Sequence, residues 1–115
     1  MAEGDSLREH PVLGVETVGG AVVVRLGGEL DLYNAGEVRT ALAGAANGSP
    51  SRVVVDLAQV EFIDSTVLGV LVEAHKSLGD LELAAPQLEV RRALLVSGLD
   101  RRLNVHDTVN DALAS

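Results

Sequence analysis

The sequence contains neither cysteine nor tryptophan, and Tyr33 and Phe62 are its only tyrosine and phenylalanine. Without thiols the chain can form no disulfide and no thiolate metal site. Proteins that hold bases or sugars by stacking use aromatic faces, and this chain has almost none to offer. Hydrophobic residues make up 47% of the chain, and they must therefore build a core from Val, Leu and Ala.

Basic residues and long apolar runs are also scarce. Nine Lys and Arg stand against 17 Asp and Glu, which gives a net charge of −8. This charge argues against nucleic acid and anionic membranes as partners, and it favours solubility and a partner with a basic patch. No apolar run approaches the roughly 18 residues of a membrane span, and residues 1–10 carry charges where a signal peptide would be apolar. We therefore expect a cytoplasmic protein.

The length of 115 residues suits one domain and is too short for two independent cores. Residues 1–10 are expected to be a flexible polar tail, and residues 11–115 to form the folded domain. This domain is expected to be a monomer or a weak dimer.

Two β-branched runs, 12–18 and 21–26, flank the glycine pair 19–20. Two glycines between such runs supply the positive φ angles of a tight hairpin turn, so the first two strands are predicted to pair. A second glycine pair, 27–28, is expected to end the second strand.

A first helix is expected after Asn34, because Asn34 and Glu37 have the spacing of a capping box. Apolar residues then recur at helical spacing, and residues 47–50 (Asn-Gly-Ser-Pro) end the helix. The continuous apolar run 52–57 predicts a central strand that is covered on both faces. A short connection through residues 61–63 is expected to follow it.

Asp64 is expected to begin a second helix that ends near Ser77. Further elements are expected in this order: a strand over 81–85 ended by Pro86, a helix over 87–97 closed by Gly98, a strand over 103–106, and a helix from Asp107 or Thr108 to Leu113. The prediction is an α/β fold with a single domain and a mixed β-sheet. An N-terminal hairpin is followed by β-α alternation, and about four helices pack against the sheet.

The second helix has two different faces. The inward face is expected to hold Val67, Leu68, Leu71, Val72, Ala74, His75 and Leu78. The outward face is expected to hold Thr66, Gly69, Val70, Glu73, Lys76 and Ser77. Gly69 costs up to about 1 kcal/mol relative to Ala inside a helix. A small, partly apolar outward stripe suits the close approach of another protein.

Ser65 lies in the first turn of this helix, directly after the predicted cap Asp64. One interpretation is that Ser65 is only a good first-turn residue. The other is that it is a modification site, where a phosphate adds about −1.5 to −2 charges. The helix dipole favours that charge, so the fold would persist. Burying the charge unpaired against a partner would cost several kcal/mol and end binding.

Residues 54–71, with Asp64-Ser65-Thr66 at their centre, resemble the signature of STAS domains, specifically of bacterial anti-sigma factor antagonists. In that family a strand leads into an Asp-Ser-Ser/Thr-Gly-Leu-Gly helix start. Residues 28–31 (Gly-Glu-Leu-Asp) resemble the family's other recurrent segment, between the second strand and the first helix. The element order also matches, so the resemblance covers residues 12–113.

The resemblance implies a regulatory protein without enzymatic activity or cofactor, which acts by partner switching in bacterial transcription, as in stress response or sporulation. Its partner would be an anti-sigma factor with serine kinase activity, which releases a sigma factor on binding. That kinase would phosphorylate Ser65 and end binding, and a serine/threonine phosphatase would reset the protein. The partner-binding residues implied are Glu29, Asp31, Asp64, Thr66, Gly69, Val70 and Glu73.

One position departs from the family pattern. Val67 stands where the family usually has glycine after the two hydroxyl residues. A β-branched residue restricts the backbone and fills more space. On the helical wheel Val67 faces inward, so two effects are open: it tunes packing only, or it also alters how a kinase fits.

Other chemistry finds little support in the sequence. The spacing of His10, His75 and His106 matches no metal motif, and His75 is expected to be a satisfied packing histidine. The serine-hydrolase, phosphate-loop and dinucleotide motifs are absent, so an independent enzyme is the least favoured interpretation. Four arginines are expected to form a solvated face or to contact an acidic partner: Arg91, Arg92, Arg101 and Arg102.

Two alternatives remain. Acyl carrier proteins are small and acidic and carry Asp-Ser-Leu, which residues 5–7 spell, but they are all-helical, and the Val-rich strands argue against them. A STAS domain that is never phosphorylated and serves as a scaffold or ligand sensor is the closer alternative.

Overall fold

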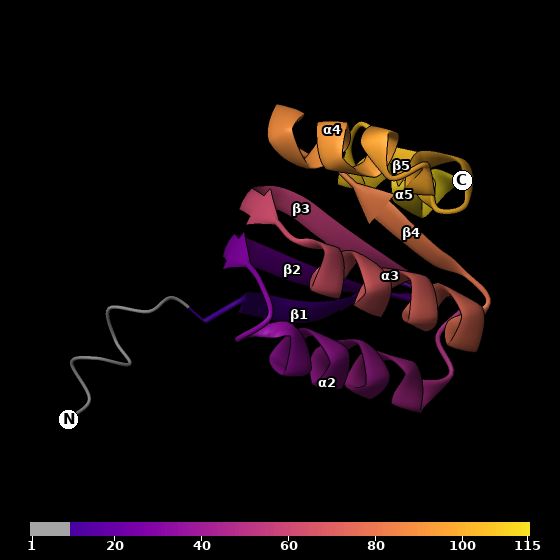
Figure 1. The fold of residues 1–115 in the computed structure, drawn as a ribbon. Helices are drawn as coiled ribbons and strands as arrows, with labels where there is room; N and C mark the ends of the chain where they lie inside the picture. Colours follow the sequence, from indigo (N-terminus) through magenta and orange to yellow (C-terminus); the bar gives the residue numbers. More distant parts are fainter. Residues whose placement is uncertain (1–9) are drawn as a thin grey trace, which may run out of the picture.

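The computed structural model describes residues 10–115, which form one five-stranded sheet with helices on both faces (Figure 1). The predicted flexible tail, residues 1–10, lies outside the described residues except for His10. The strands are β1 (Val12–Val18), β2 (Ala21–Leu30), β3 (Arg52–Ile63), β4 (Leu81–Ala84) and β5 (Asn104–His106). The helices are α2 (Ala35–Ala45), α3 (Ser65–Leu78), α4 (Leu88–Val96) and α5 (Val109–Ala114), with short 3-10 turns η1 (Ala46–Gly48) and η2 (Leu99–Arg101).

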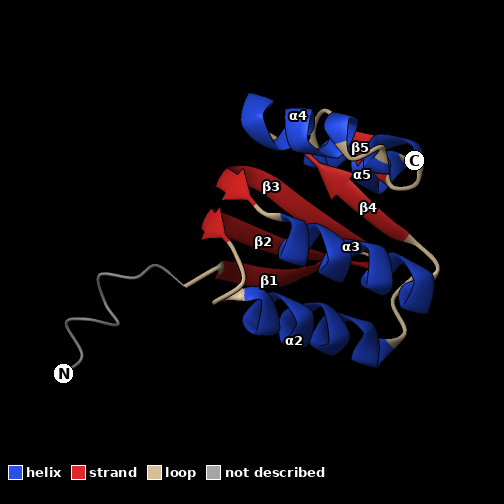
Figure 2. Cartoon of the chain, in the orientation of Figure 1, coloured by secondary structure: helices blue, strands red, loops and turns tan. Residues whose placement is uncertain are grey.

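The sheet has the strand order β1-β2-β3-β4-β5. β1 and β2 form the predicted antiparallel hairpin, and every later strand pairs in parallel with its predecessor (Figure 2). Each parallel connection contains one α-helix, and the strand order places β3 at the centre of the sheet. The predicted α/β fold with a mixed sheet and four helices is confirmed, and the all-helical alternative is wrong.

The core lies on both faces of β3, as the continuous apolar run predicts. On one face, side chains of β2, β3 and β4 pack against α2, α3 and α4, and Val55, Leu57 and Leu71 are fully buried there. On the other face a smaller cluster joins Val54 to Ala112 of α5. The core contains no aromatic ring, because the Phe and Tyr side chains are both exposed.

Two strands are longer than the sequence predicts. The glycine pair 27–28 lies inside β2, which continues to Leu30, and β3 continues to Ile63. The ladder between them shifts register twice around the glycines, which marks β-bulges. Gly28 has a φ of +77°, and a Cβ on Gly27 would lie 2.7 Å from a Leu13 methyl carbon. The glycines therefore let the strand pass through a crowded bulge and do not end it.

The remaining elements follow the predictions within two residues. Thr108 caps α5, since its hydroxyl accepts a hydrogen bond from the Asp111 amide at 3.0 Å. The four arginines are exposed, as the solvated-face interpretation expects: Arg91 and Arg92 in α4, Arg101 in η2 and Arg102 directly after it. Two of them form ion pairs, Arg91 with Asp107 at 3.1 Å and Arg92 with Glu89 at 3.3 Å. None of the helices within residues 10–115 has the length and hydropathy of a membrane span.

A buried polar cluster, which sequence analysis missed, fastens α5 to the sheet. Glu82 in β4 is 5% exposed, and its carboxylate lies 2.6 Å from His106 Nε2 and 2.9 Å from Asn104 Nδ2. Burial opposes the ionisation of Glu82, but hydrogen bonds with Asp80, His106 and Asn104 outweigh it and lower the pKa of Glu82. Hydrogen bonding to Glu82 raises the pKa of Asp80, helped by burial.

Arg52 completes this cluster from the first residue of β3. Its guanidinium donates to the Ala112 and Leu113 carbonyl oxygens at 2.9 and 3.1 Å, and it lies 3.4 Å from the Asp80 carboxylate. The carbonyls at the end of α5 thus receive the hydrogen bonds that the helix itself cannot supply.

Candidate functional site

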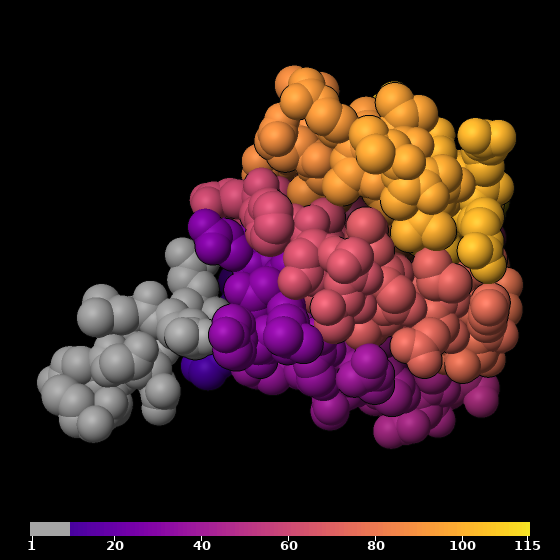
Figure 3. All heavy atoms as spheres, in the orientation of Figure 1, coloured from indigo at the N-terminus to yellow at the C-terminus, as the bar shows by residue number. Residues whose placement is uncertain are grey.

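The candidate site lies where β2 and β3 end beside each other at one edge of the sheet. Leu30, the last residue of β2, pairs with Ile63, the last residue of β3. The loop to α2 and the first turn of α3 both begin at this edge, and the segments adjoin at the surface in Figure 3. Parallel strands place their carboxyl ends at a common edge, which is where such folds build binding sites.

Asp64 holds the two segments together. Its backbone N–H donates to the Leu30 carbonyl oxygen at 3.0 Å. One carboxylate oxygen caps α3 by accepting from the Val67 amide at 3.1 Å, and the other accepts from the Leu32 amide at 3.0 Å. The predicted cap is confirmed, and the same side chain also fixes the loop that follows β2.

The loop over residues 31–34 has an internal hydrogen-bond frame. Asn34 was expected to cap α2, but its side chain makes no cap hydrogen bond. Its amide oxygen instead accepts from the Asp31 N–H and its amide nitrogen donates to the Glu29 carbonyl, both at 2.8 Å. Asp31 in turn accepts from the Tyr33 N–H at 3.0 Å. Asn34 is thus the N-cap residue of α2, as predicted, but the predicted capping-box hydrogen bond is wrong, because the Asn34 side chain is engaged by the loop.

Ser65 is the first residue of α3 and is exposed to solvent. Its side chain stands at the helix N-terminus, where the partial positive charge of the helix dipole favours an anion. Glu29 is exposed and Asp31 half-buried on the facing loop, which the Asp64 bridge brings to the same edge. The structure therefore brings together Glu29, Asp31, Asp64 and Ser65, as the resemblance implied.

The outward face of α3 is narrower than expected. Gly69 lies one turn after Ser65 and is exposed, and a Cβ added to it would meet nothing within 4 Å. Thr66 is half-buried, and Glu73 is exposed about two turns along the helix. Val70 was expected to be exposed, but it is 2% exposed. That expectation is wrong, because α3 buries one flank on the sheet and a second flank against α2.

Val67, the departure from the family pattern, faces inward and is 0% exposed. Its side chain belongs to the core that lies between the sheet and the helices, while its amide donates to the Asp64 cap. The valine is thus a packing residue behind the exposed Ser65.

Comparisons with known proteins identify the family. The STAS domain family matches residues 13–112. The chain belongs to the STAS family.

Several proteins similar to this STAS domain are anti-sigma factor antagonists. The anti-sigma-F factor antagonist RsfB of Mycobacterium tuberculosis is 31% identical over 97 residues, which cover 82% of this chain and 80% of RsfB. An anti-sigma factor antagonist from Mycobacterium paratuberculosis has a crystal structure that superimposes with a TM-score of 0.82 at 32% identity, covering 88% of this chain and 89% of the other. SpoIIAA in its unphosphorylated form shares the fold, with a TM-score of 0.73 at 24% identity over 87% and 91% of the two chains.

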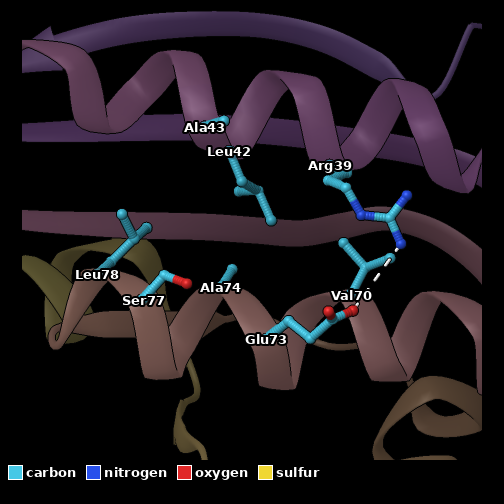
Figure 4. Close-up of a pocket in the computed structure, with 8 residues that line it drawn as sticks. All are labelled: Arg39, Leu42, Ala43, Val70, Glu73, Ala74, Ser77 and Leu78. Atoms are coloured by element: carbon cyan, nitrogen blue, oxygen red, sulfur yellow. Dashed lines mark ion pairs between the residues drawn. The ribbon is translucent and has the colours of Figure 1, made fainter.

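The STAS domain has a shallow groove between α2 and α3, beyond the first turn of α3 (Figure 4). Arg39 of α2 and Glu73 of α3 form an ion pair of 3.9 Å across it. The groove has a volume of about 190 Å³, whereas pockets for drug-sized ligands measure about 300–1,000 Å³. It is lined by Arg39, Leu42, Ala43, Val70, Glu73, Ala74, Ser77 and Leu78.

Of the three histidines, His10 lies nearest in the fold to the edge that carries Ser65, and the other two lie away from it. His10 lies 3.7 Å from the Glu37 carboxylate at the start of α2, and His106 belongs to the polar cluster under α5. His75 was expected to be satisfied, but its buried Nδ1 has no hydrogen-bond partner. That detail of the prediction is wrong, since neither a donor nor an acceptor lies within hydrogen-bond distance of this nitrogen.

Sequence analysis missed three exposed apolar residues of this STAS domain that flank Ser65. Leu32 is 64% exposed, Tyr33 80% and Phe62 51%. In the sequence they stand next to strand residues and look like core positions. Only the path of the loop and the end of β3 show that these side chains reach solvent.

Proposed function

We propose that this STAS domain is an anti-sigma factor antagonist that is switched by phosphorylation of Ser65. Unphosphorylated, it binds an anti-sigma factor with serine kinase activity, and that factor releases its sigma factor. Phosphorylation by the bound kinase ends the contact, and a serine/threonine phosphatase restores it. The domain itself performs no catalysis in this cycle and needs no cofactor.

One observation carries the proposal: Ser65 is exposed at the first turn of α3, beside a loop that Asp64 holds in place. A kinase can reach the hydroxyl without unfolding the domain. A phosphate adds about −1.5 to −2 charges at a position where the helix dipole tolerates them. The domain therefore stays folded while its surface charge changes.

The same charge opposes a docked partner. Burying an unpaired phosphate in an interface costs several kcal/mol, and each 1.4 kcal/mol lowers affinity tenfold. The contact surface proposed for the partner runs from the loop after β2 along the exposed side of α3. It comprises Glu29, Asp31, Asp64, Thr66, Gly69 and Glu73, and Val70 supports this surface from beneath because it is buried.

The test combines mass spectrometry with matched variants. The protein recovered from its own cells is expected to carry phosphate on Ser65, with an occupancy that changes under stress. Purified Ser65→Ala is expected to bind the kinase and accept no phosphate, and Ser65→Asp is expected to bind at least about tenfold more weakly. Ser77→Ala, which removes an exposed hydroxyl near the other end of α3, is the control and is expected to remain phosphorylated on Ser65.

A second candidate is a STAS scaffold or ligand sensor that is never phosphorylated. The observation that favours it is Val67, which replaces the glycine of the family pattern; because its side chain is buried, it would act on Ser65 through the packing of the first turn of α3. Ser65 peptides that are well observed and carry no phosphate under any condition, together with unchanged partner binding by Ser65→Asp, would establish this candidate instead.

A further inference from the structure

The two aromatic rings of this protein are exposed, and its core is built from aliphatic side chains alone. Tyr33 is 80% exposed and Phe62 51%, and Leu32 beside them is 64% exposed. Single exposed apolar residues are ordinary, but a group of large ones at one place marks an interaction site. Tyr and Phe are enriched at protein interfaces, and Tyr is among the residues that most often dominate the binding energy.

All three residues lie at the edge that carries Ser65. The Leu32 amide donates to the Asp64 carboxylate at 3.0 Å, which ties the loop to the residue preceding Ser65. Phe62 lies two residues before Asp64 and pairs across the sheet with Glu29, which precedes the loop by two residues. We call Leu32, Tyr33 and Phe62 the apolar collar.

The collar is held in place by hydrogen bonds before any partner arrives. The Tyr33 amide donates to Asp31 Oδ1 at 3.0 Å, and Asn34 bonds the backbone on both sides of the loop at 2.8 Å. Phe62 is part of β3. A contact surface that is already ordered loses less conformational entropy on binding, which favours affinity.

The surroundings of the collar are acidic. The two stretches that build the edge, residues 26–38 and 53–75, contain neither Lys nor Arg. Glu29 and Glu61 are exposed next to the collar residues. A complementary partner surface would therefore be an apolar hollow with basic side chains at its rim.

We propose that the apolar collar is the anchor by which the anti-sigma factor holds this protein. This inference rests on the proposed function and adds to it the chemistry of the contact. When the partner docks on the collar, the interface covers the first turn of α3 and removes water from around Ser65. A phosphate on Ser65 then has to give up its hydration against apolar groups, which is why phosphorylation ends binding.

The test uses two leucines of equal exposure. Leu32→Ser changes the collar, and Leu95→Ser changes a leucine of α4 that is 63% exposed, compared with 64% for Leu32. The probes are the purified serine-kinase anti-sigma factors encoded in the genome that encodes this chain. Binding is measured by calorimetry with wild type, Leu32→Ser, Tyr33→Ser, Phe62→Ser and Leu95→Ser, each checked for native circular dichroism.

We expect each collar variant that is natively folded to bind at least about tenfold more weakly than wild type, and Leu95→Ser to bind as wild type does. If wild type binds a probe and the folded collar variants bind it equally well, the collar is not the anchor, while the proposed function stands. If Leu95→Ser loses as much affinity as Leu32→Ser, the effect is general loss of apolar surface and the proposal is overturned. If wild type binds none of the probes, the proposed function fails and the collar proposal fails with it.

Discussion

Asp64 is the residue on which the geometry of the site depends most. Its two carboxylate oxygens accept hydrogen bonds from different elements, the Val67 amide of α3 and the Leu32 amide of the loop. A carboxylate can do this because both oxygens are acceptors. The sequence predicts the first bond from the position of Asp64 before a helix, but not the second, because Leu32 is distant in the chain.

Replacing Asp64 should therefore separate the two roles. Asp64→Asn keeps one acceptor oxygen and remains a good cap, so α3 should stay capped while the Leu32 amide loses its acceptor. Asp64→Ala loses both bonds and should lower the free energy of unfolding by about 1–2 kcal/mol. Amide hydrogen exchange followed by NMR is the measurement. In Asp64→Asn the Leu32 amide should exchange faster and the Val67 amide should stay protected; equal protection of Leu32 in wild type and Asp64→Asn would contradict the bridging role.

At the scale of the elements, α3 shows why a helical wheel predicts only part of a surface. The wheel places Val67 and Leu71 inward correctly, because the sheet covers that side. It places Val70 outward, because nothing in the sequence of α3 indicates that α2 covers a second flank. Helix–helix contacts of this kind depend on where two distant segments pack, and a single sequence does not contain that information.

The strands show a similar limit. Alternating and β-branched residues predict the hairpin, and the apolar run predicts the central strand, since both patterns are local. The ends of β2 and β3 are predicted too early, because glycines and polar residues usually end a strand and here they form bulges. The two extra lengths of strand are what bring Leu30 and Ile63 together and so create the candidate site.

Gly69 gives a test at the scale of one helix. Because the space around a Cβ at Gly69 is open, Gly69→Ala should raise the free energy of unfolding by up to about 1 kcal/mol. Gly69 lies one turn after Ser65 on the same side of α3, so the added methyl group should also hold a docked partner away. Gly69→Ala is thus expected to be more stable and to bind the anti-sigma factor more weakly.

The matched control is Gly44→Ala in α2, where a Cβ also meets nothing within 4 Å. It should stabilise the protein by a similar amount and leave binding unchanged. Urea unfolding and calorimetry supply the two measurements. Wild-type affinity in Gly69→Ala would remove this part of α3 from the proposed contact surface.

At the scale of the whole molecule, β3 separates two polar sites with different roles. Arg52, at its first residue, belongs to the cluster that fastens α5, and Ile63, at its last, adjoins Asp64 and Ser65. A strand of 12 residues rises about 3.3 Å per residue, so the two sites lie at opposite edges of the sheet. A change in the cluster should therefore alter stability and leave the switch untouched.

Glu82 makes that separation testable through pH. Its pKa in the folded protein is lowered, because hydrogen bonds with Asp80, His106 and Asn104 outweigh burial. An acid with a lowered pKa stabilises the fold above its unfolded value, here 4.5, and this contribution is lost as the pH falls through the folded pKa. Asp80 acts in the opposite direction, because its pKa is raised mainly by hydrogen bonding to Glu82.

Glu82→Gln should consequently be less stable than wild type at neutral pH by about 1–3 kcal/mol, as expected for a buried hydrogen-bonded group that loses its charge. The difference should shrink as the pH falls below 4.5, because wild type then loses the contribution that the variant already lacks. Urea unfolding at a series of pH values measures this, with Glu89→Gln, an exposed partner of Arg92 on α4, as the control for a change in net charge. A stability difference that does not vary with pH would show that Glu82 acts through packing alone. A loss of anti-sigma factor binding by folded Glu82→Gln would show that the two edges of the sheet are coupled.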